Sequence, residues 1–161
     1  MIAAVNEIKP HGNKYVFKFL TNNKTNNMTT KETVKAIYDA FANGNIPFIL
    51  ETVSENFTWQ DPCDPSVVPY GGLHKGRTGF MEFFQQLGGN TDTTLWQVDD
   101  YVSEGELVIA EGKHGFQSKK TGKNVLSEWA MTWRFENGVP VAGRAYYNTS
   151  DSEKAFNQNL N

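Results

Sequence analysis

Residues 125–135 read VLSEWAMTWRF, and the pattern of this stretch decides the fold class. Successive side chains of a β-strand point to opposite faces, so odd-numbered residues share one face and even-numbered residues share the other. The predicted inner face consists of Ser127, Trp129, Met131, Trp133 and Phe135. The predicted outer face consists of Glu128, Ala130, Thr132 and Arg134. The stretch therefore predicts a half-buried strand with large aromatic side chains on its core side.

The chain around this strand is divided by hairpin-type dipeptides. Glu104-Gly105, Thr121-Gly122 and Asn137-Gly138 separate four apolar runs. A glycine after a small or polar residue is typical of tight turns between antiparallel strands. The second half of the chain is therefore predicted to be a four-stranded meander.

Three helices are predicted before the meander. Thr29 and Glu32 have the spacing of a capping box, which marks the start of the first helix. The apolar positions of this helix recur with helical spacing at Val34, Ile37, Tyr38 and Phe41. Asn45 is expected to cap a short second helix that carries Pro47 in its first turn. A third helix is predicted from Thr78 to Leu87, closed by Gly88-Gly89.

Between the second and third helices the sequence predicts a short strand, Phe57 to Asp61, and then a long irregular loop. Residues 62–76 contain several prolines and glycines and exceed the usual loop length of ~4–6 residues. Helices followed by strands predict an α+β fold. We expect three N-terminal helices packed on a strongly curved, mainly antiparallel sheet that encloses an apolar pocket, in a cone-like fold.

The chain has 161 residues and divides at Met28. Residues 1–27 are rich in Asn and Lys, and they are interpreted as an extension outside the fold or as an added strand at residues 15–19. Residues 28–161 are predicted to form a single domain.

Composition excludes several classes of function. The net charge of −3 and the lack of a Lys/Arg cluster argue against nucleic acid or an anionic membrane as a partner. No run approaches the ~20 apolar residues of a membrane helix. Cys63 is the only cysteine, which favours a reducing, cytoplasmic compartment. The three histidines lack metal-ligand spacing, so we expect no metal and no cofactor.

The order of these motifs resembles the nuclear transport factor 2-like superfamily, in particular its SnoaL-like and ketosteroid isomerase-like members, over residues 29–150. The motifs are residues 38–45 (YDAFANGN), 57–62 (FTWQDP), 76–80 (GRTGF) and 133–138 (WRFENG). The resemblance implies a two-fold homodimer through the outer face of the sheet. The outward residues Ala130, Thr132 and Tyr146 are uncharged, which agrees with an interface.

The resemblance also implies roles for single residues. Asp61 stands at the position of the general base of ketosteroid isomerases. The two positions that donate hydrogen bonds in those enzymes hold Ile37 and Met131, which cannot donate, so steroid isomerisation itself is not expected. The candidate replacement donors are Tyr38, Tyr147, His74 and the indole of Trp129. Tyr38 is one residue from the family's position, which suggests that it turns away from the pocket.

Asp61 has two interpretations. An aspartate before a proline often ends a strand and caps a turn. Beneath an aromatic cavity it would instead be desolvated, with a raised pKa, and would serve as a base. The other predicted pocket residues are Trp59, Tyr38, His74, Phe83, Trp129, Met131, Trp133 and Tyr147.

Two functions fit this site. The first is a cofactor-independent isomerase, cyclase or hydrolase that acts on a small apolar carbonyl-type or epoxide compound. The second is a non-catalytic small-ligand-binding or dimeric adaptor domain. A second polar group directed at the same point as Asp61 would favour the enzyme.

Overall fold

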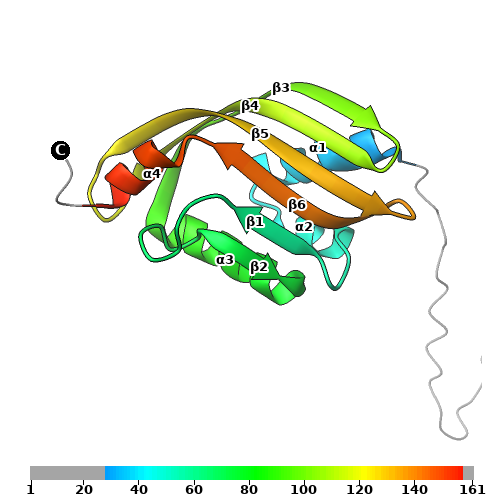
Figure 1. Ribbon diagram of the computed structural model, residues 1–161, viewed down its shortest axis with the longest axis horizontal. Helices are drawn as coiled ribbons and strands as arrows, with labels where there is room; N and C mark the ends of the chain where they lie inside the picture. The colour runs from blue at the N-terminus through cyan, green and yellow to red at the C-terminus, as the bar shows by residue number, and fades with distance from the viewer. Residues whose placement is uncertain (1–27, 158–161) are drawn as a thin grey trace, which may run out of the picture.

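Six strands form one curled sheet, and helices α1 (Thr30–Ala42), α2 (Ile46–Thr52) and α3 (Gly76–Asn90) lie under it (Figure 1). The computed structural model describes residues 28–157. The strands are β1 (Thr58–Asp61), β2 (Gly72–Lys75), β3 (Thr91–Glu104), β4 (Leu107–Ser118), β5 (Asn124–Glu136) and β6 (Val139–Tyr147). Their order in the sheet is β2-β1-β6-β5-β4-β3. Only the pairing of β1 with β6 is parallel, so the sheet is mainly antiparallel as predicted.

Strand β5 has the predicted alternation. Trp129, Met131, Trp133 and Phe135 are buried. Glu128 and Arg134 on the other face are exposed. The strand lies between β4 and β6, with Met131 opposite Ala110 on one side and Ala145 on the other. The concave face of the meander is therefore the core face.

The predicted capping box begins α1. The Oγ1 atom of Thr29 accepts the backbone N–H of Glu32 at 3.2 Å, and Oε2 of Glu32 accepts the backbone N–H of Thr29 at 2.7 Å. The helix ends at Ala42, Asn43 is its C-cap residue, and Gly44 follows with a φ of 68°. Glycine adopts this left-handed conformation without strain, so the chain can leave the helix at this point.

Residues 62–76 are not entirely irregular, which corrects the prediction of a single loop. Strand β2 forms within this segment and pairs antiparallel with β1, with Asp61 opposite Gly72 and Trp59 opposite His74. Gly72 has a φ of 88°, a conformation that favours glycine at the start of this strand. The new strand has only four residues, so its sequence alone carries little strand signal.

The predicted end of α3 at Gly88-Gly89 is also wrong, because the helix continues to Asn90. Neither glycine adopts the left-handed conformation that would stop a helix. The last carbonyl groups of the helix are capped by side chains that follow these glycines. The hydroxyl of Thr91 donates to Leu87 O at 2.7 Å, and Nδ2 of Asn90 donates to Gln86 O at 2.8 Å.

Helix α2 contributes less to the core than its apolar sequence suggests. Ile49 is fully buried, whereas Phe48 is 37% exposed. The C-terminal end of α2 is held by Arg77, whose Nε and Nη2 donate to the carbonyl of Val53 at 3.1 and 2.8 Å. Arg77 therefore anchors this end of the helix.

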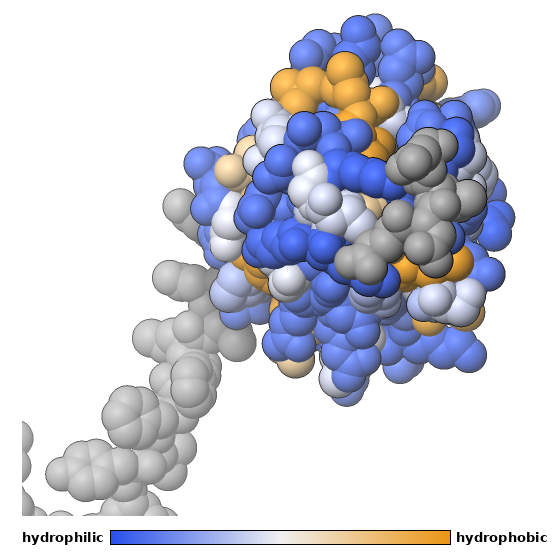
Figure 2. All heavy atoms as spheres, turned by 90° about the vertical axis from the view of Figure 1, so that its left-hand side faces the viewer, coloured by the Kyte–Doolittle hydropathy of each residue, from blue (hydrophilic) through white to orange (hydrophobic). Residues whose placement is uncertain are grey.

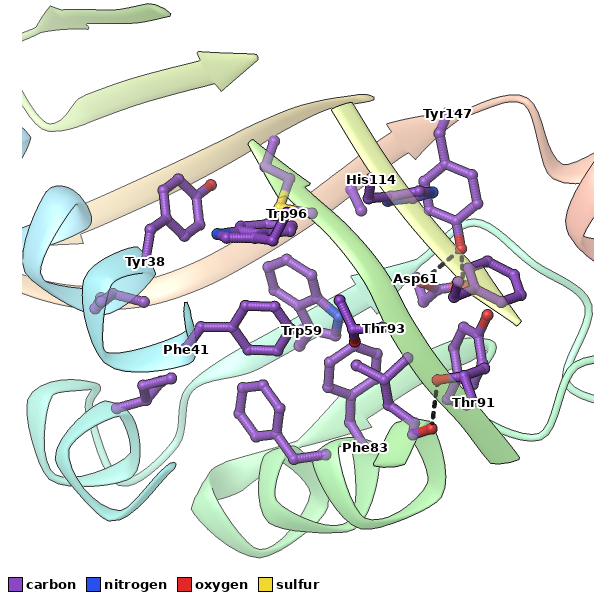
Figure 3. Close-up of a pocket in the computed structure, with 18 of the residues that line it drawn as sticks. Tyr38, Phe41, Trp59, Asp61, Phe83, Thr91, Thr93, Trp96, His114 and Tyr147 are labelled. Carbon is purple, nitrogen blue, oxygen red and sulfur yellow. Dashed lines mark hydrogen bonds between the residues drawn. The ribbon is translucent and has the colours of Figure 1, made fainter. Parts of the chain in front are cut away.

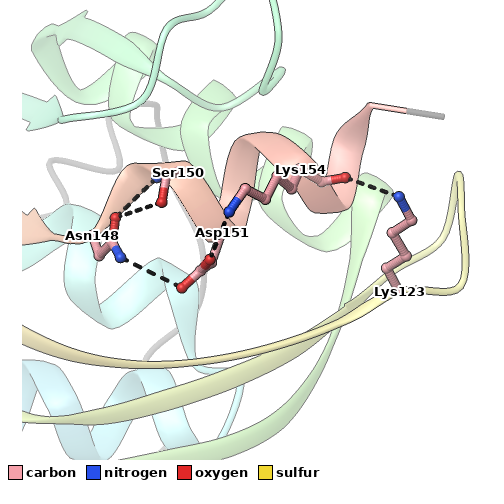
Figure 4. Close-up of polar contacts among 5 residues, drawn as sticks. All are labelled: Lys123, Asn148, Ser150, Asp151 and Lys154. Carbon is pink, nitrogen blue, oxygen red and sulfur yellow. Dashed lines mark hydrogen bonds and ion pairs between the residues drawn. The ribbon is translucent and has the colours of Figure 1, made fainter. Parts of the chain in front are cut away.

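A fourth helix, α4 (Thr149–Phe156), follows β6 and was not predicted. Oδ1 of Asn148 accepts the backbone N–H of Ser150 at 3.1 Å, and Lys154 pairs with Asp151 at 3.7 Å (Figure 4). Phe156 is 1% exposed and packs on Tyr70, so α4 closes one end of the core. Figure 2 views this end of the molecule, whose surface is largely hydrophilic with separate apolar patches.

The outer face of the sheet carries more charge than expected. Thr132 lies opposite Arg144, and Ala130 lies opposite Glu111. The guanidinium of Arg144 lies 5.7 Å from the ring centroid of Tyr146. The uncharged residues seen in the sequence are therefore interleaved with charges from the neighbouring strands.

None of the helices within residues 28–157 is long and apolar enough to cross a membrane. The alternative strand at residues 15–19 lies outside the described residues, and the interpretation of residues 1–27 stays a prediction.

Candidate functional site

An aromatic cavity lies between the concave face of the sheet and the helices α1 and α3 (Figure 3). Its volume is about 100 Å³. A single water needs ~10–15 Å³ by the same kind of measure, so the cavity is several times larger than one water. Its walls are mainly aromatic and aliphatic, with contributions from all three helices under the sheet.

Seven of the nine predicted site residues line this cavity: Asp61, Trp59, Tyr38, Phe83, Met131, Trp133 and Tyr147. Trp129 and His74 do not. The ring of Trp129 stacks on Trp96 with a centroid distance of 4.9 Å, and Trp96 takes its place in the wall. The imidazole of His74 is turned toward the backbone, with Nε2 at 2.9 Å from Tyr70 O. Both predictions are therefore corrected.

Asp61 ends β1 with its carboxylate buried, at a residue exposure of 3%. The hydroxyl of Tyr147 donates to Oδ2 at 2.8 Å and also lies 3.0 Å from Oδ1 (Figure 3). Oδ1 accepts the backbone N–H of Cys63 at 3.0 Å. Both interpretations of the aspartate thus hold in part, because one oxygen caps the turn after Pro62 while the carboxylate as a whole is buried beside the cavity.

Burial sets the electrostatics of this group. Burial raises the pKa of Asp61, against the opposing effects of the hydrogen bonds from Cys63 and Tyr147. Burial also raises the pKa of Tyr147, so this phenol keeps its proton and acts as a donor to Asp61. The pKa of Cys63 rises to about 12, mainly through burial, which excludes this thiol as an activated nucleophile.

His114 is a site residue that the sequence analysis missed. It lies on β4 and lines the cavity, with its ring centroid 5.1 Å from that of Tyr147. Its Nε2 atom is buried and has no hydrogen-bond partner within residues 28–157. Burial lowers the pKa of His114 to about 4, so the imidazole is neutral at physiological pH. Period-2 spacing with the buried Val108 and Ala110 could have placed it on the inner face.

The lowered pKa predicts a loss of stability in acid. An unfolded histidine has a pKa near 6.5. Between pH 6.5 and about 4, His114 is therefore protonated in the unfolded chain and neutral in the folded protein. The stability contribution is complete above pH 6.5 and is lost as the pH falls through the folded value. We expect a loss of about 3 kcal/mol from this group. Urea unfolding at pH 7 and pH 4.5 should show a smaller acid-induced loss for His114→Leu than for the wild type, and equal losses would contradict the assignment.

The two donor positions implied by the family resemblance point into the cavity but are apolar, since both Ile37 and Met131 line it. Tyr38 also lines the cavity, which corrects the expectation that it turns away. Its hydroxyl accepts the indole N–H of Trp133 at 2.8 Å. Figure 3 shows Tyr38 at the opposite end of the cavity from Asp61 and Tyr147. Tyr38 is therefore not positioned beside the buried carboxylate.

Within the described part of the chain, no group of three or more His, Cys, Asp or Glu side chains is arranged to hold a metal ion. The cavity wall combines the titratable groups of Asp61, Tyr147 and His114 with the hydroxyl groups of Tyr38, Tyr70, Thr91 and Thr93 and the indole N–H of Trp59. A neutral imidazole, a buried carboxylate and a phenol can bind, orient and move a proton.

The sequence of this chain is similar to a protein-family model and to a curated protein. A family model described as a SnoaL-like domain matches residues 34–141. Patulin synthesis protein F from Aspergillus clavatus is 30% identical over 81 residues, which make up 49% of this chain. The match spans 41% of the length of that curated relative.

Solved structures share the fold at low sequence identity. An NTF2-like protein of unknown function from Burkholderia pseudomallei has a TM-score of 0.72 and 22% identity, with 80% of this chain and 98% of the other covered. A candidate polyketide cyclase from Pseudomonas putida has a TM-score of 0.65 and 20% identity, with 81% and 99% covered. These likenesses concern the fold.

Proposed function

The chain belongs to the SnoaL-like domain family and has the NTF2-like fold, and from this premise we propose that it is a small-molecule isomerase or cyclase. Its substrate is a small, largely apolar carbonyl compound, and no cofactor takes part. Asp61 is the general base that removes a proton from the carbon next to the carbonyl group. The observation that carries this proposal is the buried Asp61–Tyr147 pair at the wall of an aromatic cavity.

The raised pKa supports the role of Asp61. A general base works best when its pKa approaches the operating pH, and burial moves a carboxyl group in that direction. The aromatic walls exclude water and fit a flat apolar ring. Tyr147 is a second polar group directed at the same point, which favours an enzyme over a purely apolar binding site.

The names of the relatives are compatible with this chemistry. One is described as a candidate polyketide cyclase and another as a patulin synthesis protein, and both descriptions concern small organic molecules. If Asp61 takes its proton from water instead of carbon, the same base supports epoxide hydrolysis. A proton-exchange assay separates it from enolisation, because only enolisation exchanges carbon-bound hydrogen.

The experiment uses 2-tetralone, a bicyclic aromatic ketone with acidic protons beside its carbonyl. In D₂O, proton NMR should show that the wild-type protein accelerates loss of these proton signals above the buffer rate. No reduction, oxidation or added cofactor is needed for this exchange. Saturable binding of 2-tetralone without acceleration would contradict the enzymatic proposal.

A second function is favoured by one specific contact. The Oδ1 atom of Asp61 accepts the backbone N–H of Cys63, so part of the carboxylate's hydrogen-bonding capacity serves the turn. A carboxylate used only in this way would support a non-catalytic ligand-binding domain. Binding without turnover in the tetralone experiment is the result that this alternative expects.

Assembly and compartment complete the proposal. We propose a homodimer through the outer face of the sheet, where Val102 is 66% exposed and Ile109 is 38% exposed. The charges on this face would then pair across the two-fold axis. A cytoplasmic location is proposed from the single cysteine, Cys63, which is free and buried.

A further inference from the structure

Removal of a proton beside a carbonyl leaves negative charge on the carbonyl oxygen, and a positioned hydrogen-bond donor must stabilise that charge. Ile37 and Met131, the inward residues at the resemblance-implied donor positions, have no donor atom. Tyr147 already donates to Asp61, and the indole of Trp133 donates to Tyr38. The oxyanion donor therefore has to come from another residue of the cavity wall.

Trp59 carries an unused donor in this wall. The residue is 4% exposed and lines the cavity. Its Nε1 atom is buried and has no hydrogen-bond partner among residues 28–157. An indole N–H can only donate, and a buried donor left unpaired costs free energy that a ligand oxygen can recover.

The orientation of the indole is fixed by packing on β6. A Cβ atom built on Gly143 would lie 2.6 Å from Cε3 and 2.7 Å from Cζ3 of Trp59. These two atoms belong to the edge of the indole opposite Nε1. The benzene edge therefore lies against the backbone of β6, and the N–H edge is turned away from it. Figure 3 shows the Trp59 ring in the middle of the cavity residues.

The spacing along β1 suits the reaction. Trp59 and Asp61 are two residues apart on one strand, so their side chains share a face at a separation of roughly 7 Å. In a carbonyl substrate the acidic carbon and the oxygen are both bonded to the carbonyl carbon. The base lies one hydrogen-bond length from the acidic carbon, and the donor lies one hydrogen-bond length from the oxygen. The distance from base to donor is therefore comparable to the separation of the two side chains.

We propose that the Nε1–H of Trp59 is the oxyanion donor of the proposed reaction, so this inference rests on the proposed function. Asp61 takes the proton from the carbon beside the carbonyl, and the electron pair of that C–H bond forms the C=C bond of an enolate. The carbonyl π electrons move to the oxygen, which accepts the hydrogen bond from Trp59. Return of this proton from Asp61 to a different carbon completes an isomerisation. Deuterium exchange takes place when the carboxyl proton of Asp61 is first replaced by deuterium from D₂O and the deuteron then returns to the original carbon.

The test compares Trp59→Phe with Trp129→Phe. Both indoles are buried and both have an Nε1 atom without a partner within residues 28–157, but only Trp59 lines the cavity. We expect Trp59→Phe to lower kcat for deuterium exchange of 2-tetralone by about 10²-fold, the usual effect of losing one oxyanion donor. Trp129→Phe should keep a rate close to that of the wild type.

A binding measurement separates this inference from the proposed function. 2-Naphthol resembles the flat enolate, and its fluorescence reports binding at a pH where it is partly ionised. Trp59→Phe should weaken this binding about tenfold or more relative to Trp129→Phe. If the wild type binds 2-naphthol but exchanges no deuterium, the proposed function fails while the naphthol comparison still decides the role of Trp59. Equal effects of the two substitutions on both measurements would overturn the inference.

Discussion

We expect Asp61→Asn to lower the rate of deuterium exchange of 2-tetralone by about 10²- to 10⁴-fold, the usual contribution of a general base. Asparagine keeps the shape of the side chain, and its amide oxygen can still accept the N–H of Cys63 that Oδ1 of Asp61 accepts. It has no basicity at neutral pH, so proton transfer is removed. The amide nitrogen faces the hydroxyl of Tyr147, and this contact is kept only if the hydroxyl accepts from the amide instead of donating. NMR exchange rates of the wild type and the variant at the same pD measure this difference.

Asp64 supplies the matched control. Its Oδ1 accepts the backbone N–H of Ser66 at 2.8 Å, so it caps a turn as Asp61 does, but its side chain is exposed. Asp64→Asn should leave the exchange rate unchanged. A rate for Asp61→Asn close to that of the wild type would assign the proton transfer to another group and favour the ligand-binding function.

Asp61→Asn is also expected to change the free energy of unfolding, in a direction that follows from the pKa of Asp61. Because the folded pKa of Asp61 is raised, its contribution to stability is complete below the unfolded value near 3.9 and is lost as the pH rises through the folded value. Asparagine does not titrate. Asp61→Asn should therefore be at least as stable as the wild type at pH 7, and its advantage should shrink as the pH falls to about 4.

The parts of the fold that the sequence predicted are those with strong local signals. The alternation around Trp133 placed the core face of β5, and the Thr29–Glu32 capping box placed the start of α1. Both signals come from side chains a few residues apart, so no knowledge of distant contacts is needed.

The parts that were missed depend on distant contacts. Strand β2 exists because residues 72–75 pair with β1, and α4 is held by Phe156 against Tyr70 and Phe116. Gly88-Gly89 looked like a helix stop, yet the helix end is capped by side chains beyond it. In each case tertiary packing outweighs a weak or misleading local pattern.

The site shows the same division. Asp61 was placed in the cavity from its motif position and Tyr147 was named as a candidate donor, and the structure brings their polar atoms to 2.8 Å. Trp129 was placed on the correct face, but the ring of Trp96 from β3 stacks on it and lines the cavity in its place. The alternation along a strand predicts which face of the sheet a residue occupies. It does not predict which side chain of a neighbouring strand covers that residue.

That stacked pair leads to the largest expected effect on stability, for Gly112→Ala. Gly112 lies in the interior of β4, opposite Trp129 of β5 and Val98 of β3. A Cβ atom there would overlap the carbonyl oxygen of Gln97 and lie 2.9 Å from Cζ2 of Trp129. Neither can move away easily, because one is backbone and the other is a buried ring. We expect a loss of about 3 kcal/mol or more in the free energy of unfolding, measured by urea denaturation.

Gly88→Ala is the matched control, with the opposite expected sign. Gly88 lies within α3, its φ is not left-handed, and a Cβ atom there would meet nothing within 4 Å. Alanine is favoured over glycine inside a helix by about 1 kcal/mol, so this variant should gain stability. A tolerated Gly112→Ala would mean that β3 and β4 can separate locally. The Trp96–Trp129 stack would then be a movable part of the cavity wall, and the cavity could widen for a larger ligand.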